Sequence, residues 1–253
     1  MTVELPSETA FVLILIFARL GGLVMVLPGL GETAVPARIR LGFALALTIV
    51  LVPVLAPGFP ALPDAPFAAL RLVLVELVTG LFIGLTVRLV MGALSVAGTA
   101  IAMQTGLGFA EAVDPSGTAP PATLFTGFLS VLSVTLILVT DLHHVLLNAV
   151  ADSYVLFKPG TLAPAGNFAE TAIAVMTGAF EVAVQIAAPF LLFGLIFHIG
   201  SGILSRLVPQ AQIFFLAVPA GILIGFVLLM TTLGVMIVWF LRYFEAALAP
   251  FLR

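Results

Sequence analysis

The sequence contains no cysteine, and only 8% of its 253 residues are charged. The lack of cysteine excludes disulfide bonds, thiolate metal sites and cysteine nucleophiles. Roughly a quarter of the residues of a soluble domain are charged, so a chain with so few charged residues cannot cover a surface that faces water. A net charge of −3, spread along the chain, offers no basic surface to nucleic acid. We therefore expect neither a soluble protein nor one that binds nucleic acid.

Apolar residues make up 62% of the chain and gather in about six blocks, which run over residues 11–30, 41–55, 67–104, 122–150, 168–207 and 213–240. A spanning helix needs about 20 such residues, whereas no segment alternates with the period of two of a barrel strand. The third block is either one long tilted helix or two broken ones. The sequence predicts an all-α, polytopic integral membrane protein built of long helical hairpins that Gly and Pro interrupt. Since the first block lacks a cleavage pattern, we expect it to be retained.

Several ionisable residues fall inside the apolar blocks, among them Arg19, Glu76, Arg88, Glu181 and His198. Each would cost about 2.5–3.5 kcal/mol at a helix centre that faces lipid, so each should face protein or water. Glu76 and Arg88 lie about 18 Å apart along one helix and cannot pair with each other. An ion pathway is one interpretation, but we favour buried charges that hold helices or subunits together.

Small residues repeat at four-residue or eight-residue spacing in two of the blocks. Gly80, Gly84 and Gly92 lie in the third block, and Gly221 and Gly225 lie in the last. This spacing lets membrane helices approach closely. We therefore expect these five glycines at helix contacts.

Polar residues are concentrated in the segment 139–154. Asp141, His144, Asn148 and Asp152 share one face of a helix, while His143 points about 100° away from it. A metal site would need further ligands from another element, and neither an HExxH motif nor a second cluster supplies them. The sequence therefore predicts a polar helix face, with no metal site, cofactor site or catalytic motif.

Between the third and fourth blocks, the segment 101–121 interrupts the apolar pattern with Gly106, Gly108, Glu111, Asp114 and a Pro pair. Irregular backbone at membrane depth is tolerated where it lines a cavity or is buried in protein. The residues alone indicate a polar, flexible interruption.

Five stretches together resemble the R subunit family of the flagellar type III export gate (FliR, SpaR and YscT-like proteins). They are residues 18–53, the small-residue helix 80–102, "QTGLGFAEAVDP" (104–115), "HHVLLNAVADSY" (143–154) and "RLVPQAQIFFLAVP" (206–219). The chain departs from the family at Ala211 and Gln212, where Leu-Asn is frequent, and at Ala220 and Gly221, where a Lys is frequent. Contacts of that Asn or Lys are not carried over.

The resemblance implies a non-enzymatic gate subunit in the flagellar basal body of the bacterial inner membrane. It implies a helical assembly with P-type and Q-type subunits, contact with the A-type and B-type export proteins, and a channel for unfolded protein substrates. Residues 1–157, including loop 104–117, resemble a P-type subunit, and residues 158–253 resemble a Q-type hairpin. The loop corresponds to a pore plug, here Gly106, Leu107, Gly108, Phe109, Glu111 and Asp114.

Three alternatives remain open at this point. An injectisome gate subunit would share the same motifs. A small-molecule transporter would also show broken helices and buried charges, but it usually carries an internal repeat, which we do not find between the two halves. An intramembrane enzyme would need a catalytic set that the sequence lacks.

Overall fold

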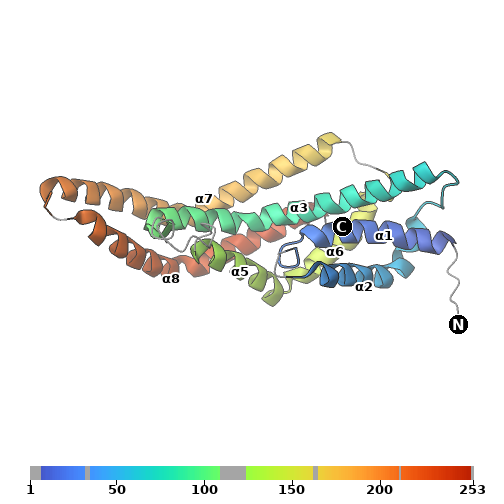
Figure 1. The fold of residues 1–253 in the computed structure, drawn as a ribbon, viewed down its shortest axis with the longest axis horizontal. Coiled ribbons are helices and arrows are strands. Elements are labelled where there is room, and N and C mark those ends of the chain that lie inside the picture. Colours follow the sequence, from blue (N-terminus) through green and yellow to red (C-terminus); the bar gives the residue numbers. More distant parts are fainter. Residues whose placement is uncertain (1–6, 32–34, 109–123, 162–164, 211, 252–253) are drawn as a thin grey trace. The chain divides into compact units, whose positions relative to one another are not determined.

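The computed structural model describes residues 7–31, 35–108, 124–161, 165–210 and 212–251. Within these ranges the regular structure is helical throughout, which confirms the all-α prediction (Figure 1). The α-helices are α1 (Ser7–Val26), α2 (Ala37–Leu55), α3 (Pro66–Thr105), α5 (Leu124–Val139), α6 (Leu142–Leu156), α7 (Ala165–Leu207) and α8 (Ile213–Leu248). Two short 3-10 helices, η1 (Ala56–Gly58) and η2 (Ala249–Phe251), follow α2 and α8.

Among the residues that the structure describes, five helices are long and apolar enough to cross a membrane, and α5 with α6 forms a sixth span if the two count as one. The prediction of a polytopic membrane protein is therefore confirmed. The third apolar block is one continuous helix of 40 residues. The fourth block is not continuous, because α5 ends at Val139 and α6 begins at Leu142. Asp141 stands at this break with a φ of 60°, a left-handed conformation that Asp tolerates better than most residues.

The chain forms two compact units, and each unit draws on separated parts of the sequence. The first unit comprises Met1–Leu89, Asp141–Val175 and Ala246–Arg253, and the second comprises Val90–Thr140 and Met176–Glu245. Helices α3, α7 and α8 therefore contribute residues to both. The predicted division into residues 1–157 and 158–253 is a different one, because it rests on a resemblance to P-type and Q-type subunits. It stays a prediction.

The core of the first unit forms where α1, α2, α3 and α6 meet. Helices α1 and α2 lie side by side in it (Figure 1). One cluster of buried side chains joins the four helices and consists of Ile16, Leu20, Leu23, Val24, Ala44, Ile83, Val150 and Tyr154. Dense packing and satisfied polar groups hold membrane helices together, since lipid tails are as apolar as leucine.

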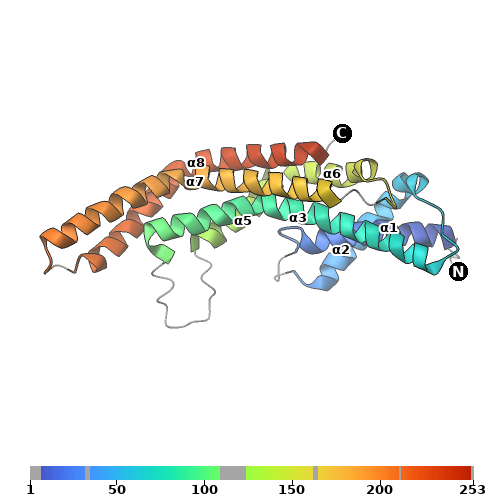
Figure 2. The same ribbon diagram turned by 90° about the horizontal axis from the view of Figure 1, so that it is seen from above.

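In the second unit, α7 and α8 run side by side as a hairpin, and the end of α3 packs against both α5 and this hairpin (Figure 2). Three phenylalanines of α7 and α8 are fully buried, namely Phe190, Phe240 and Phe244. Phe125 of α5 contacts Phe226 of α8, with 5.2 Å between the ring centroids. Aromatic side chains thus supply much of the core of this unit.

Hydroxyl side chains inside the helices form hydrogen bonds to their own backbone. Thr48, Thr79 and Thr86 each donate to the carbonyl four residues earlier, over distances of 2.7–2.9 Å. Each hydroxyl is thereby satisfied without a partner on a second helix, which allows threonine in an apolar environment.

Candidate functional site

A buried ion pair lies inside the first unit. Arg19 on α1 and Glu76 on α3 have side chains that are 1% and 0% exposed, and Arg19 Nε donates a hydrogen bond of 2.7 Å to Glu76 Oε2. A charge in so dry an environment persists only when it is paired and its remaining hydrogen-bonding groups are satisfied. The other contacts of the two side chains meet this requirement.

The remaining nitrogens of Arg19 bind the C-terminal end of α6. Nη1 donates to the carbonyl of Ser153 over 3.1 Å, and Nη2 donates to the carbonyl of Phe157 over 3.0 Å. The carbonyl of Ser153 already accepts the N–H of Phe157 over 2.8 Å, and Arg19 adds a second donor to it. The carbonyls at a helix end carry the negative end of the helix dipole, so a guanidinium is a favourable partner there. The guanidinium also lies over the ring of Tyr154, with its carbon 4.1 Å from the ring centroid. Arg19 therefore caps α6.

The second carboxylate oxygen of Glu76 fixes the turn that follows α6. Glu76 Oε1 accepts a hydrogen bond of 2.9 Å from the backbone N–H of Gly160. Gly160 has a φ of +78°, and a Cβ at this position would lie 2.8 Å from Cδ2 of Leu72. Glycine avoids both the strain and the contact. Every polar atom of the Glu76 carboxylate is thus engaged.

These contacts define a charged centre, by which we mean Arg19, Glu76 and the backbone groups of Ser153, Phe157 and Gly160 that they bind. It joins α1, α3, the end of α6 and the turn after α6. Because hydrogen bonds occupy both charges, the arrangement serves to fix helix positions. The sequence pointed to Arg19 and Glu76 but missed the other three, since they contribute main-chain atoms that no side-chain pattern reveals.

Arg88, the third predicted buried charge, is exposed in this chain and pairs with none of the described residues. Of the two predicted roles, helix packing or subunit packing, burial of Arg88 against other helices is not found within this chain. The reason is helical phase, because the twelve residues from Glu76 to Arg88 turn the side chain about 120° around α3. A role for Arg88 in subunit packing stays a prediction.

Four of the five predicted glycines lie where helices touch. A Cβ on Gly80 would collide with the carbonyl of Arg19, and one on Gly84 would lie 2.8 Å from the carbonyl of Leu23. In the second unit, Gly221 and Gly225 face Thr105 in the same way.

Gly92 differs, because nothing lies within 4 Å of the position that its Cβ would take. The expectation of a close contact at Gly92 is therefore not met within the chain. Close approaches also occur at Gly22 against Leu77, at Gly98 against Thr126 and at Gly194 against Gln104.

The predicted plug loop begins at the end of α3. Gly106 ends the helix with a φ of +81°, and Leu107 is buried. Phe109, Glu111 and Asp114 lie outside the residues that the structure describes.

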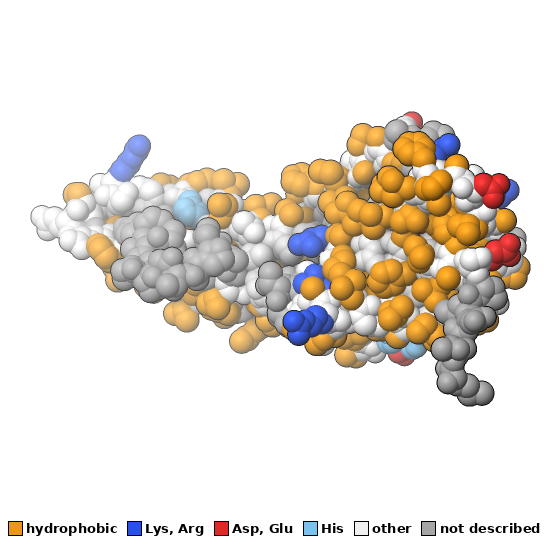
Figure 3. Space-filling view, turned by 45° about the vertical axis from the view of Figure 1, so that its right-hand side comes forward, with side chains coloured by type: hydrophobic (Ala, Val, Ile, Leu, Met, Phe, Trp, Pro, Cys, Tyr) orange, Lys and Arg blue, Asp and Glu red, His pale blue; other side chains and the backbone are white. Residues whose placement is uncertain are grey.

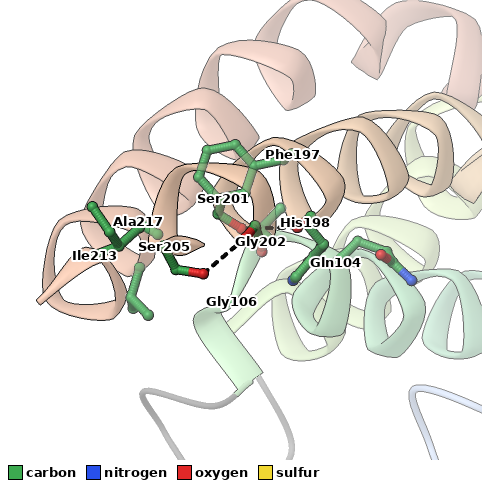
Figure 4. A pocket seen from close by; sticks show the side chains of 11 residues that line it. Gln104, Gly106, Phe197, His198, Ser201, Gly202, Ser205, Ile213 and Ala217 are labelled. Carbon is green, nitrogen blue, oxygen red and sulfur yellow. Dashed lines mark hydrogen bonds between the residues drawn. The ribbon is translucent and has the colours of Figure 1, made fainter. Parts of the chain in front are cut away.

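Gly106 borders a pocket of about 280 Å³ in the second unit, shown in Figure 4. The end of α3 forms one side, and α7 and α8 form the other, with Gln104, Thr105, Gly106, Phe197, His198, Ser201, Gly202, Ser205, Ile213, Ala217 and Val218 as lining residues. The hydroxyls of Ser201 and Ser205 donate to α7 carbonyls over 3.1 and 2.8 Å. The pocket is mainly apolar, and its hydroxyls are already satisfied.

The predicted polar face of α6 points away from the core. Asp141, His144 and Asn148 are exposed and Asp152 is half-buried, whereas Leu146, Val150 and Ser153 on the opposite side are buried. The structure also brings His143 close to Asp141 and His144, although the helical repeat predicts that His143 points about 100° away from them. Ligand atoms of Asp141, His143 and His144 lie within 4.8 Å of one another.

Comparison with known proteins gives one consistent result. Residues 10–247 match the profile of the family described as bacterial export proteins, family 1. The chain is 39% identical to the flagellar biosynthetic protein FliR of Caulobacter vibrioides over 236 residues, which cover 93% of this chain and 94% of that protein. It is 28% identical to FliR of Pectobacterium carotovorum over 222 residues (87% and 82%), and 26% identical to FliR of Bacillus subtilis over 230 residues (89% and 87%). Because the match spans nearly the whole chain, the protein belongs to the FliR family of bacterial export proteins.

Proposed function

We propose that this chain is the R-type subunit of a flagellar type III export gate, a non-enzymatic subunit needed to export flagellar components and to build the flagellum. The observation that carries the proposal is the similarity to a flagellar biosynthetic protein over 93% of the chain and 94% of that protein. As part of the same proposal, we expect the subunit in the bacterial inner membrane, within the flagellar basal body.

The surface of the chain supports an assembled state. Apolar side chains cover much of the face seen in Figure 3. In the most apolar segment of each helix, only 28% of α7 and 22% of α8 is buried within the chain. Surfaces of this kind mark contacts with other helices or with lipid. We assign them to P-type and Q-type gate subunits, with residues 1–157 in a P-like position and 158–253 as a Q-like hairpin. The A-type and B-type export proteins complete the set of partners.

The segment that starts at Gly106 acts as the pore plug in this proposal. Gly106 supplies a left-handed turn at which the chain leaves α3, and Leu107 is apolar and buried. An apolar constriction can block ions by excluding water, while a flexible backbone lets it open for an unfolded chain. Phe109 extends the apolar part, and Glu111 and Asp114 stay hydrated at its mouth.

The first experiment tests assembly. The chain should be unstable or aggregated when it is produced alone in mild detergent, and stable when it is produced with its P-type partner. A monodisperse chain that gains nothing from the partner would contradict the gate assignment. A cell that lacks the gene and still swims would contradict the flagellar assignment and favour an injectisome.

The second experiment tests the plug. Deletion of residues 106–113 should leave the complex assembled but leaky to small ions, so that cells that overproduce it grow slowly. Gly106→Val and Gly108→Val should lower export without loss of assembly, measured by co-purification in the same cells. A deletion that assembles, exports at the normal rate and leaks nothing would show that the segment is only a connector.

A further inference from the structure

Three side chains of a kind that can bind a metal ion lie at the start of α6 and play no part in the proposed gate function. Asp141 precedes the helix, and His143 and His144 follow in its first turn. The ring centroids of the two histidines lie 4.1 Å apart, although adjacent helical residues ordinarily diverge by about 100°. Asp141 Oδ1 lies 3.6 Å from Nδ1 of His144. Three potential ligand atoms therefore converge at one place.

The backbone of Asp141 explains this convergence. An Asp before a helix ordinarily turns its carboxylate onto the free backbone N–H groups of the first turn. Here Asp141 is left-handed, its carbonyl accepts the N–H of His144 over 2.9 Å, and its side chain forms no capping hydrogen bond. The carboxylate lies beside the imidazole of His144 and does not cap the backbone. An anionic oxygen beside two imidazoles is a known ligand set for a metal ion.

We propose that Asp141, His143 and His144 bind a divalent transition metal ion, with Zn²⁺ as the best fit. Two imidazole nitrogens and one carboxylate oxygen suit Zn²⁺, whereas Mg²⁺ and Ca²⁺ prefer oxygen ligands alone. Water takes the fourth position of the tetrahedron. This inference is independent of the proposed gate function.

The three ligand atoms lie slightly farther apart than a bound Zn²⁺ requires, so the side chains must move a little when the ion binds. Tetrahedral Zn²⁺ with bonds of about 2.0–2.2 Å places its ligand atoms about 3.3–3.6 Å apart, and the three ligand atoms here lie within 4.8 Å of one another. The side chains of His144 and Asp141 are 66% and 80% exposed, so they can rotate by the difference without moving the core. The site lies at the opposite end of α6 from the carbonyls that Arg19 binds, so its loss leaves the charged centre intact.

The test uses Zn²⁺ and the full chain co-purified with its gate partners through a tag without histidine. Isothermal titration should show one saturable site per chain that the Asp141→Asn, His143→Ala and His144→Ala variants each weaken at least about tenfold. Asn tolerates the left-handed conformation, so Asp141→Asn tests the charge without disturbing the turn. The sequence contains one further histidine, His198 on α7, and His198→Ala in the same complex is the matched control, expected to leave binding unchanged.

A second measurement separates binding at this site from binding elsewhere in the complex. Zn²⁺ should protect His143 and His144, but not His198, from modification by diethylpyrocarbonate, as read by peptide mass spectrometry. Zn²⁺ binding of unchanged affinity and stoichiometry in the His143→Ala/His144→Ala double variant overturns the proposal. The absence of saturable binding, or equal protection of all three histidines, does the same.

Discussion

Removal of the negative charge of Glu76 should destabilise the chain more than any other single change of one carboxylate to an amide. Glu76→Gln keeps an oxygen that can accept the N–H of Gly160, but it leaves the guanidinium of Arg19 buried without a counter-ion. Breaking one partner of a buried pair costs about 3–5 kcal/mol. A folded domain is stable by about 5–15 kcal/mol in total, so this loss removes a large part of the stability.

A second change in the same pair should restore part of the loss. In the Arg19→Met/Glu76→Gln double variant no charge remains buried, and methionine fills much of the volume of the arginine stem. The carbonyls of Ser153 and Phe157 lose their hydrogen bonds from Arg19, at about 1 kcal/mol each. We therefore expect the double variant to lie about 2 kcal/mol below the wild type, and above the Glu76→Gln single variant.

The assay is a titration of the partner-bound complex with SDS in detergent micelles, followed by circular dichroism and by release of the chain. Glu181→Gln is the matched control, because Glu181 is an exposed carboxylate on α7, and its substitution should change stability by less than about 0.5 kcal/mol. If Glu76→Gln behaves like Glu181→Gln, or if the double variant is less stable than the single one, the charged centre does not hold the helices together.

Three further predictions concern helix contacts, the turn after α6 and the exposed arginine. Gly80→Ala should lower the stability of the chain by about 1–3 kcal/mol, since its Cβ meets the backbone of α1, whereas Gly92→Ala, with open space around it, should be neutral or stabilise by up to about 1 kcal/mol in the same SDS titration. Gly160→Ala should cost about 1–2 kcal/mol for its left-handed φ, and equal stability of the alanine variant would show that the turn relaxes freely. Arg88→Leu should weaken co-purification with the P-type partner and leave the proton and sodium dependence of export unchanged; normal assembly with altered ion dependence would instead favour an ion pathway.

The number and type of helices follow from composition, because the membrane leaves a long apolar segment few alternatives to the α-helix. The break between α5 and α6 was harder to foresee. Thr140 and Asp141 interrupt an apolar run only briefly, and the left-handed conformation of Asp141 is a rare state for a residue other than glycine. A break of this kind depends on which conformation the surrounding packing selects.

The charged centre was partly accessible from the sequence. Arg19 and Glu76 stood out as charges in apolar blocks, but nothing in the residue pattern favours one partner for Glu76 over another. The angular position of Arg88 on α3 could have been calculated from the helical repeat, which places Arg88 about 80° from Gly80 and about 120° from Glu76 around the helix. The carbonyls of Ser153 and Phe157 could not have been found, because every residue carries one.

The contacts of Arg19 also determine the order in which the chain can be completed during synthesis. Arg19 enters the membrane with α1 before its partners exist, since Glu76 follows 57 residues later and Phe157 follows 138 residues later. At about 5–20 residues per second, the ribosome needs about 3–11 s to deliver the carboxylate and about 7–28 s to deliver the last carbonyl. Over this interval a guanidinium that would cost about 2.5–3.5 kcal/mol in lipid has to be sheltered by water, by lipid head groups or by the insertion machinery. Biogenesis of the subunit thus contains a waiting period of several seconds, which ends when the end of α6 closes over Arg19.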